Sequence, residues 1–157
     1  MKKGVDISKA LGRHIPFASH LGVRLVAHGG GRATLEVDLI EELTNSWGSA
    51  HGGVIMTLLD ISMAMAARSL DPKAVGAITV EMKTTFIATC QGRLIAEGHC
   101  LHSGKSVSFC EAEARDAEGR TVARASGTFM VRRKGGGQDD ASSSKPAPAS
   151  IKPGAGG

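Results

Sequence analysis

The stretch from Gly53 to Ala67 constrains the fold of this chain more than any other feature. It reads GVIMTLLDISMAMAA, and its only polar side chains are Thr57, Asp60 and Ser62. A segment that is apolar on every side is typical of a helix buried at the centre of a fold. The rest of the chain must therefore surround this helix.

Asp60 stands out because a carboxylate inside an apolar helix is costly unless it is hydrogen-bonded, protonated or used. The preceding residues, NSWGSAHGG at 45–53, are rich in turn formers and end in two glycines at the expected helix N-terminus. Backbone N–H groups at that end have no partner within the helix and favour negative charge. The segment thus combines a candidate base or nucleophile with a candidate oxyanion site. The structural alternative is that Asp60 caps or hydrogen-bonds a neighbouring element.

The segments on either side of this helix predict mainly strands. Residues 6–19 predict one short helix, broken near Pro16, and an alternating pattern predicts a hairpin of residues 22–27 and 32–39. The long helix should end near Leu70, and four further strand-like runs follow at 75–88, 93–102, 106–115 and 120–131. An antiparallel sheet that follows a single apolar helix should wrap around it. We therefore expect an α+β hotdog fold, an antiparallel sheet wrapped around one long central helix.

Composition predicts a single domain over residues 1–134 and a disordered tail over 135–157, rich in Gly, Ser, Pro and Ala. Most of the formal charge of +4 comes from residues 132–157, so the folded part is nearly neutral. Aromatic residues make up only 3% of the chain, which leaves few side chains to stack on bases. We therefore expect no nucleic-acid partner.

The chain also lacks the features of a membrane or secreted protein. Residues 1–12, MKKGVDISKALG, hold no apolar leader segment, and the apolar helix is too short to span a bilayer. Cys90, Cys100 and Cys110 are an odd number without metal-type spacing, which is typical of free thiols in a reducing compartment. The expectation is a cytoplasmic protein without a membrane partner.

A set of motifs resembles the hotdog-fold acyl-CoA thioesterases of the phenylacetate-degradation type, over about residues 15–133. The set consists of Asn45, then His-Gly-Gly at 51–53, then Asp60 nine residues after the histidine, and Thr-Val-Glu-Met at 79–82 on the next strand. The resemblance implies that Asp60 acts as general base or nucleophile. It also implies that the Gly52 amide and the Asn45 side chain polarise the thioester carbonyl, and that Thr79 supplies a hydroxyl group.

Elementary chemistry agrees with these roles. Thioester hydrolysis develops negative charge on the carbonyl oxygen, and each preorganised N–H donor can stabilise it by about 3–4 kcal/mol. Two of the motif residues have local alternatives. His51 could donate a proton or contact the oxyanion, or it could be a loop histidine that fixes the helix entry. Asn45 could be a local turn residue.

The resemblance also implies residues that bind coenzyme A. They are Gly53, Phe86, His102, Ser103, Gly104, Lys105, Ser106 and Val107. Lys105 suits a phosphate or the pantetheine arm, and the alternative is a solvated lysine at a hairpin tip.

Spacing predicts that the site is shared between subunits. Gly52 and Asp60 are eight residues apart, about 12 Å along a helix, so they cannot both reach one thioester within about 3 Å. Two antiparallel helices across a two-fold axis would bring Gly52 of one copy beside Asp60 of the other. The resemblance implies such a homodimer, with dimers paired into tetramers.

These observations predict a thioester hydrolase that acts on an acyl-CoA substrate without a cofactor or a metal. His99 and His102 should lie on opposite faces of their strand, which argues against a shared metal. The chain also has no G-x-S-x-G nucleophile elbow. Two alternatives remain: a hotdog hydratase or dehydratase acting on acyl-CoA or acyl-carrier protein, and a non-catalytic acyl-CoA-binding module.

Overall fold

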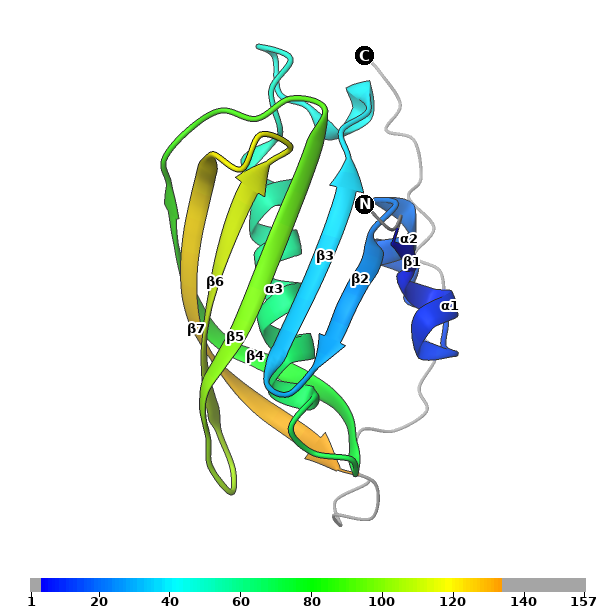
Figure 1. Ribbon diagram of the computed structural model, residues 1–157, viewed down its shortest axis with the longest axis vertical. Coiled ribbons are helices and arrows are strands. Elements are labelled where there is room, and N and C mark those ends of the chain that lie inside the picture. Colours follow the sequence, from blue (N-terminus) through cyan, green and yellow to red (C-terminus); the bar gives the residue numbers. More distant parts are fainter. Residues whose placement is uncertain (1–3, 134–157) are drawn as a thin grey trace, which may run out of the picture.

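The computed structural model describes residues 4–133 of the 157-residue chain. In this part a 17-residue helix, α3 (Gly52–Arg68), lies against one face of a seven-stranded sheet (Figure 1). The strands are β1 (Val5–Asp6), β2 (Arg24–Gly29), β3 (Arg32–Asp38), β4 (Ala74–Phe86), β5 (Arg93–Ser103), β6 (Ser108–Asp116) and β7 (Thr121–Arg133). The tail predicted over 135–157 lies outside the described residues, as do the two ends of the domain predicted over 1–134.

The sheet has the strand order β1-β2-β3-β5-β6-β7-β4, and all neighbouring strands are antiparallel. Alternation along β3 places Ala33, Leu35 and Val37 on the inner face, each no more than 1% exposed. The sheet curves around α3 (Figure 1), which confirms the hotdog architecture that the sequence predicts.

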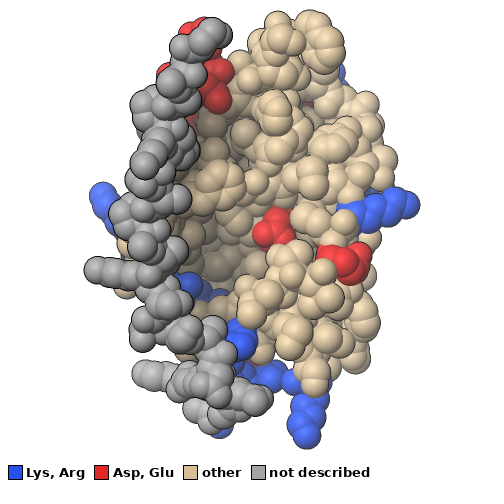
Figure 2. Space-filling model, turned by 180° about the vertical axis from the view of Figure 1, so that it is seen from behind, with Lys and Arg blue, Asp and Glu red and all other residues tan. Residues whose placement is uncertain are grey.

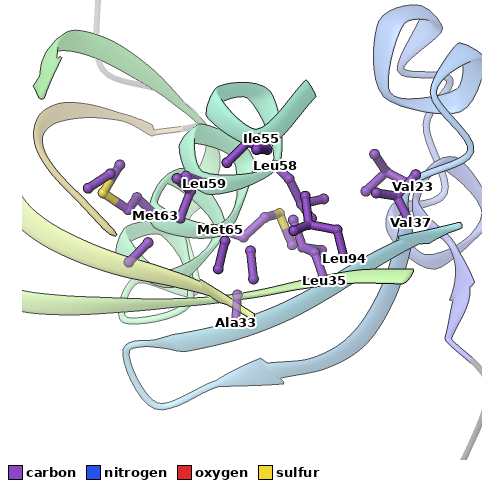
Figure 3. Close-up of a cluster of buried hydrophobic side chains, with 14 of the residues drawn as sticks. Val23, Ala33, Leu35, Val37, Ile55, Leu58, Leu59, Met63, Met65 and Leu94 are labelled. Atoms are coloured by element: carbon purple, nitrogen blue, oxygen red, sulfur yellow. The ribbon is translucent and has the colours of Figure 1, made fainter. Parts of the chain in front are cut away.

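α3 is buried against the sheet because apolar side chains cover most of its circumference. Leu58, Leu59 and Met63 are at most 1% exposed and pack among the inward residues of the sheet, such as Leu35 and Leu94 (Figure 3). Each such side chain contributes roughly 1.5–3 kcal/mol by leaving water. No helix in residues 4–133 has both the length and the apolar character that crossing a bilayer requires.

Gly98 marks the closest approach between α3 and the sheet. It is buried in β5, and a Cβ atom placed on it would overlap the backbone carbonyl of Ser62 in α3. Helix and strand backbones are therefore in direct contact there. Only glycine allows this separation, so Gly98 sets the height of the helix above the sheet.

The N-terminal segment differs from the expected single helix. It forms β1 and two short helices, α1 (Ile7–Leu11) and α2 (Pro16–His20). Pro16 occupies the first turn of α2, where its missing N–H costs nothing, so it starts a helix and does not merely interrupt one. Asp6 caps α1 by accepting a hydrogen bond from the Lys9 amide, 3.1 Å long.

Glu36 is the main exception to the alternation of β3. The pattern places it outward, yet it is only 1% exposed, because Arg24 and Arg93 cover it at 2.9 and 3.7 Å. Burial alone would raise the pKa of Glu36. Hydrogen bonds from Arg24 and the Gly4 amide, together with the two positive charges, outweigh burial and hold that pKa below its ordinary value of 4.5.

The three cysteines are unpaired and buried, as the sequence predicts. Burial raises the pKa of Cys90 to about 11. Burial, together with the neighbouring Cys100, raises that of Cys110 to about 12. Both thiols are therefore poor nucleophiles at neutral pH.

β4 forms one edge of the sheet, and within residues 4–133 it hydrogen-bonds to no strand other than β7. Large apolar side chains on and beside this edge face solvent: Ile78 is 48% exposed, Val80 55% and Met56 38%. An unpaired edge strand with apolar neighbours is a surface that another polypeptide can cover.

Candidate active site

Asp60 and Thr79 meet at the middle of α3. The Thr79 hydroxyl, on β4, donates a 2.6 Å hydrogen bond to Oδ1 of Asp60. The Asp60 side chain is partly buried, and no Lys, Arg or His in residues 4–133 forms an ion pair with it. The hydrogen bond fixes one carboxylate oxygen and leaves the other free to accept a proton or to attack a carbon atom.

His51 caps the N-terminus of α3. Its Nδ1 accepts a 3.0 Å hydrogen bond from the Gly53 amide, so in the neutral ring the proton lies on Nε2. The Gly53 amide is thereby occupied. The Gly52 amide has no hydrogen-bond partner in the described part of the chain. Of the two glycines, Gly52 is therefore the one whose amide remains free to donate to a substrate oxygen.

The loop before α3 is folded around the Asn45 side chain. Its Oδ1 accepts hydrogen bonds from the amides of Trp47 (3.0 Å) and Ser49 (3.2 Å), the geometry of a local turn residue. The Nδ2 group donates no hydrogen bond within residues 4–133, so it remains available to a ligand. Trp47 is 84% exposed near the tip of this loop.

Phe86, at the end of β4, lies over the start of α3. A Cβ atom on Gly52 would come within 3.5 Å of its ring, while half of the Phe86 side chain remains exposed. The aromatic ring therefore borders the free Gly52 amide on one side.

The predicted coenzyme A segment, residues 102–107, forms the hairpin between β5 and β6. The Gly104 amide donates to the Val107 carbonyl at 2.8 Å and closes the turn, and Lys105 and Ser106 are exposed at its tip. This hairpin and the N-terminus of α3 lie at opposite ends of the molecule (Figure 1). Within one chain, the structure does not bring residues 102–107 together with Gly52.

The prediction that His99 and His102 lie on opposite strand faces is wrong. A bulge between Cys100 and His102 shifts the register, so that His99 pairs with Glu111 and His102 with Phe109, both outward positions. His102 stacks on Phe109, with ring centroids 6.2 Å apart. In residues 4–133 no three His, Cys, Asp or Glu side chains are grouped closely enough to hold a metal ion.

The candidate residues of one chain thus form separate groups. Asn45, His51, Gly52 and Phe86 lie at the N-terminal end of α3, and Asp60 and Thr79 lie two helical turns away. The eight residues from Gly52 to Asp60 correspond to about 12 Å along the axis. A single thioester cannot contact both the Gly52 amide and the Asp60 carboxylate of the same chain.

A cavity of about 180 Å³ lies beside Asp60, between α1, α3 and the start of β4. Its lining is mostly apolar and includes Leu11, Ile61 and Ala64, and two arginines, Arg13 and Arg68, also line it. Neither arginine belongs to a motif that the sequence alone reveals. Figure 2 shows the rear face, on which most described side chains are uncharged and several Lys and Arg side chains lie toward the lower end.

A larger hollow of about 360 Å³ lies on the outer face of the sheet. Charged side chains such as Arg32, Glu97 and Glu113 line it, and the sheet separates it from Asp60. It is twice as large as the cavity beside Asp60. Of these two, only the smaller cavity combines an apolar lining with Asp60, a carboxylate without an ion-pair partner in residues 4–133, and such a lining is typical of small-molecule sites.

Comparison with known proteins places this geometry in context. A model of the thioesterase superfamily matches residues 48–123. A protein of Saccharolobus solfataricus, provisionally named an esterase, is 34% identical over 114 residues, which cover 72% of this chain and 81% of that protein. Acyl-coenzyme A thioesterase 13 of Homo sapiens is 28% identical over 123 residues, covering 76% of this chain and 87% of that protein. The structure of the PaaI protein of E. coli, from the phenylacetic acid degradation operon, shares the fold with a TM-score of 0.72 at 22% identity, covering 80% and 90% of the two chains.

Proposed function

The chain belongs to the thioesterase superfamily, and from this premise we propose that it hydrolyses an acyl-coenzyme A thioester to the free acid and coenzyme A. The observation that carries the proposal is the Asp60 carboxylate. It has no cationic partner in the described residues, is held by Thr79 at 2.6 Å, and faces an apolar cavity. Such a group is poised to act on a carbonyl carbon bound next to it.

Asp60 would act in one of two ways. As a general base it takes a proton from a water molecule, whose oxygen attacks the thioester carbon while the coenzyme A thiolate leaves. As a nucleophile it attacks the carbon directly and expels the coenzyme A thiolate, giving an anhydride that water then hydrolyses. In both routes Thr79 fixes one carboxylate oxygen so that the other points at the substrate.

The oxyanion would be stabilised from a second copy of the chain. The Gly52 amide is free and lies at the positive end of the α3 dipole, but it is two turns from Asp60 of the same chain. An antiparallel arrangement of two α3 helices places Gly52 of the partner subunit beside this Asp60. Asn45 of the partner subunit, whose Nδ2 group is free, would add a second donor.

The exposed edge of the sheet supports this homodimer. Ile78 and Val80 on β4 and Met56 on α3 present apolar surface next to the unpaired strand edge. Pairing two β4 edges would bury this surface and bring the two α3 helices side by side. We propose that such dimers pair further into tetramers.

The nucleotide part of the substrate would lie along the β5–β6 hairpin. In an antiparallel dimer, the hairpin of one copy lies at the same end as Gly52 and Phe86 of the other copy. The Lys105 ammonium and the Gly104–Ser106 turn would then face the phosphates, and Phe86 of the partner subunit would border the pantetheine arm.

The direct test is release of coenzyme A from a panel of aryl- and fatty-acyl-CoA esters, followed with a thiol reagent. A hydratase or dehydratase would alter the acyl chain without releasing coenzyme A, and a binding module would retain the ester intact. We propose that the reaction needs neither a metal nor a redox cofactor, so EDTA should leave the rate unchanged. If none of the esters in the panel releases coenzyme A, the proposal is refuted.

A further inference from the structure

We propose that the cavity beside Asp60 selects acyl groups that carry a carboxylate at the end remote from the thioester, and that Arg13 and Arg68 recognise it. This inference rests on the proposed hydrolysis of acyl-CoA. It adds the chemical class of the acyl group, which the fold does not specify.

Among the described residues that line the cavity, only these two arginines are cationic. Arg68 lies in the last turn of α3, and its Nε donates to the Ala74 carbonyl at 3.4 Å. Arg13 lies between α1 and α2, and its Nη1 donates to the Val75 carbonyl at 3.4 Å. Each long bond uses one of the five N–H donors of a guanidinium group, so most donors of both groups remain free.

Neither arginine is neutralised by a carboxylate in the described part of the chain. Six other arginines do form ion pairs there: Arg24, Arg93, Arg115, Arg120, Arg124 and Arg133. Two uncompensated guanidinium groups at one mostly apolar cavity form a site for an anion, because planar N–H pairs match a carboxylate. An uncharged alkyl chain would make no hydrogen bond to these donors.

The spacing along α3 sets the size of the acyl group. Asp60 and Arg68 are eight residues apart, about 12 Å along the axis. A thioester carbon next to Asp60 and a carboxylate next to Arg68 would therefore be joined by a chain of several carbons. The cavity of about 180 Å³ slightly exceeds the roughly 150 Å³ that holds a benzene ring. An acyl group of about six carbons fits the volume, and the Arg68 side chain, which leans back toward the N-terminus of α3, shortens the distance that the acyl group must span.

Charge also fixes the orientation of such a substrate. The Asp60 carboxylate would repel a second negative charge placed near the reacting carbon. The guanidinium groups of Arg13 and Arg68 would attract that charge at the other end of the cavity. An acyl group with its carboxylate at the remote end meets both requirements.

The test compares two esters of equal carbon number, adipoyl-CoA with a terminal carboxylate and hexanoyl-CoA without one. We expect the wild-type protein to hydrolyse adipoyl-CoA with a kcat/KM at least about tenfold higher, the discrimination expected from a charge-assisted hydrogen bond. Arg68→Met and Arg13→Met should each lower the adipoyl-to-hexanoyl ratio by a similar factor. The matched control is Arg32→Met, on the outer face of the sheet, which should leave the ratio unchanged.

Each outcome decides a different point. A wild-type ratio near one, or a ratio that both variants leave unchanged, overturns this inference while hydrolysis itself stands. If neither ester nor any other acyl-CoA is hydrolysed, the proposed function fails and the inference fails with it. If Arg68→Met does not fold, Arg13→Met decides the matter, because Arg13 is exposed between two short helices.

Discussion

Replacing Asp60 by asparagine separates a chemical role of this carboxylate from a structural one. Asparagine has nearly the same shape and retains an oxygen that can accept the hydrogen bond from the Thr79 hydroxyl. It cannot take a proton from water or attack a carbon atom. We therefore expect Asp60→Asn to fold normally and to lose most of its thioesterase activity.

The structure allows both effects to be estimated. Loss of a positioned general base lowers kcat/KM by at least about a hundredfold, or about 2.7 kcal/mol of transition-state stabilisation. The stability effect is limited to the difference between a hydrogen bond to a charged group, about 1.5–3 kcal/mol, and one to a neutral group, about 0.5–1.5 kcal/mol. Because the Asp60–Thr79 pair is partly open to solvent, the expected loss of folding stability is about 1 kcal/mol or less. The melting temperature should then fall by about 5 °C at most.

The assay is coenzyme A release, measured beside thermal unfolding for the wild type, Asp60→Asn and a control. Glu97→Gln is a suitable control, because it removes one negative charge from an exposed position on the outer face of the sheet. It should change neither quantity. If Asp60→Asn keeps its rate within a few-fold of wild type while its melting temperature falls by about 10 °C or more, Asp60 is structural and the mechanism is wrong.

Three further predictions test assembly, acid stability and thiol reactivity. Mixed dimers of inactive Asp60→Asn and Asn45→Ala subunits, made by co-expression and confirmed by mass, should regain part of the activity. The reason is that one of their two sites keeps both wild-type halves. No gain in activity over either parent would exclude a shared site. The low pKa of Glu36 in the folded state adds stability that is complete above about pH 4.5 and is lost as the pH falls through the folded pKa. In Glu36→Gln, the free energy of unfolding measured with urea should therefore depend less on pH in the acid range. Cys90 and Cys110, with pKa values of about 11 and 12, should react with a disulfide reagent only after denaturation, and rapid reaction in the native protein would contradict their burial.

Much of the fold follows from local patterns in the sequence. The apolar run predicts α3 to within two residues of its end at Arg68, and the alternation at 32–39 matches β3 with its inward side chains. Glycine-containing turns separate the last four strands within a few residues of their observed bounds. These features depend on neighbours along the chain, so a single sequence contains the information needed to predict them.

Features that depend on distant contacts could not be predicted in this way. The burial of Glu36 requires Arg24 and Arg93 on two other strands, and the shared outward face of His99 and His102 requires a bulge in β5. Neither has a local signature. The alternation that assigns inside and outside fails where a tertiary ion pair or an extra residue intervenes.

The candidate site shows the same division. The Asp60–Thr79 contact agrees with a motif read from two separate segments. The use of His51 Nδ1 to hold the Gly53 amide is a geometric detail that leaves Gly52 as the free donor. Arg13 and Arg68 line one cavity only because the N-terminal segment lies beside α3 and the start of β4, which no periodicity in the sequence indicates.

Gly98 has a consequence for mutational tolerance. It has no functional group, yet its contact with the Ser62 backbone lies two residues from Asp60 on the same helix. Any larger residue would lift that part of α3 and carry the carboxylate with it, and a displacement of about 1 Å can cost a hundredfold in rate. Gly98→Ala should therefore lower the rate of the reaction as an active-site substitution would, although residue 98 touches no substrate. Substitutions at residue 98 should therefore be limited by the requirements of catalysis as well as by those of folding.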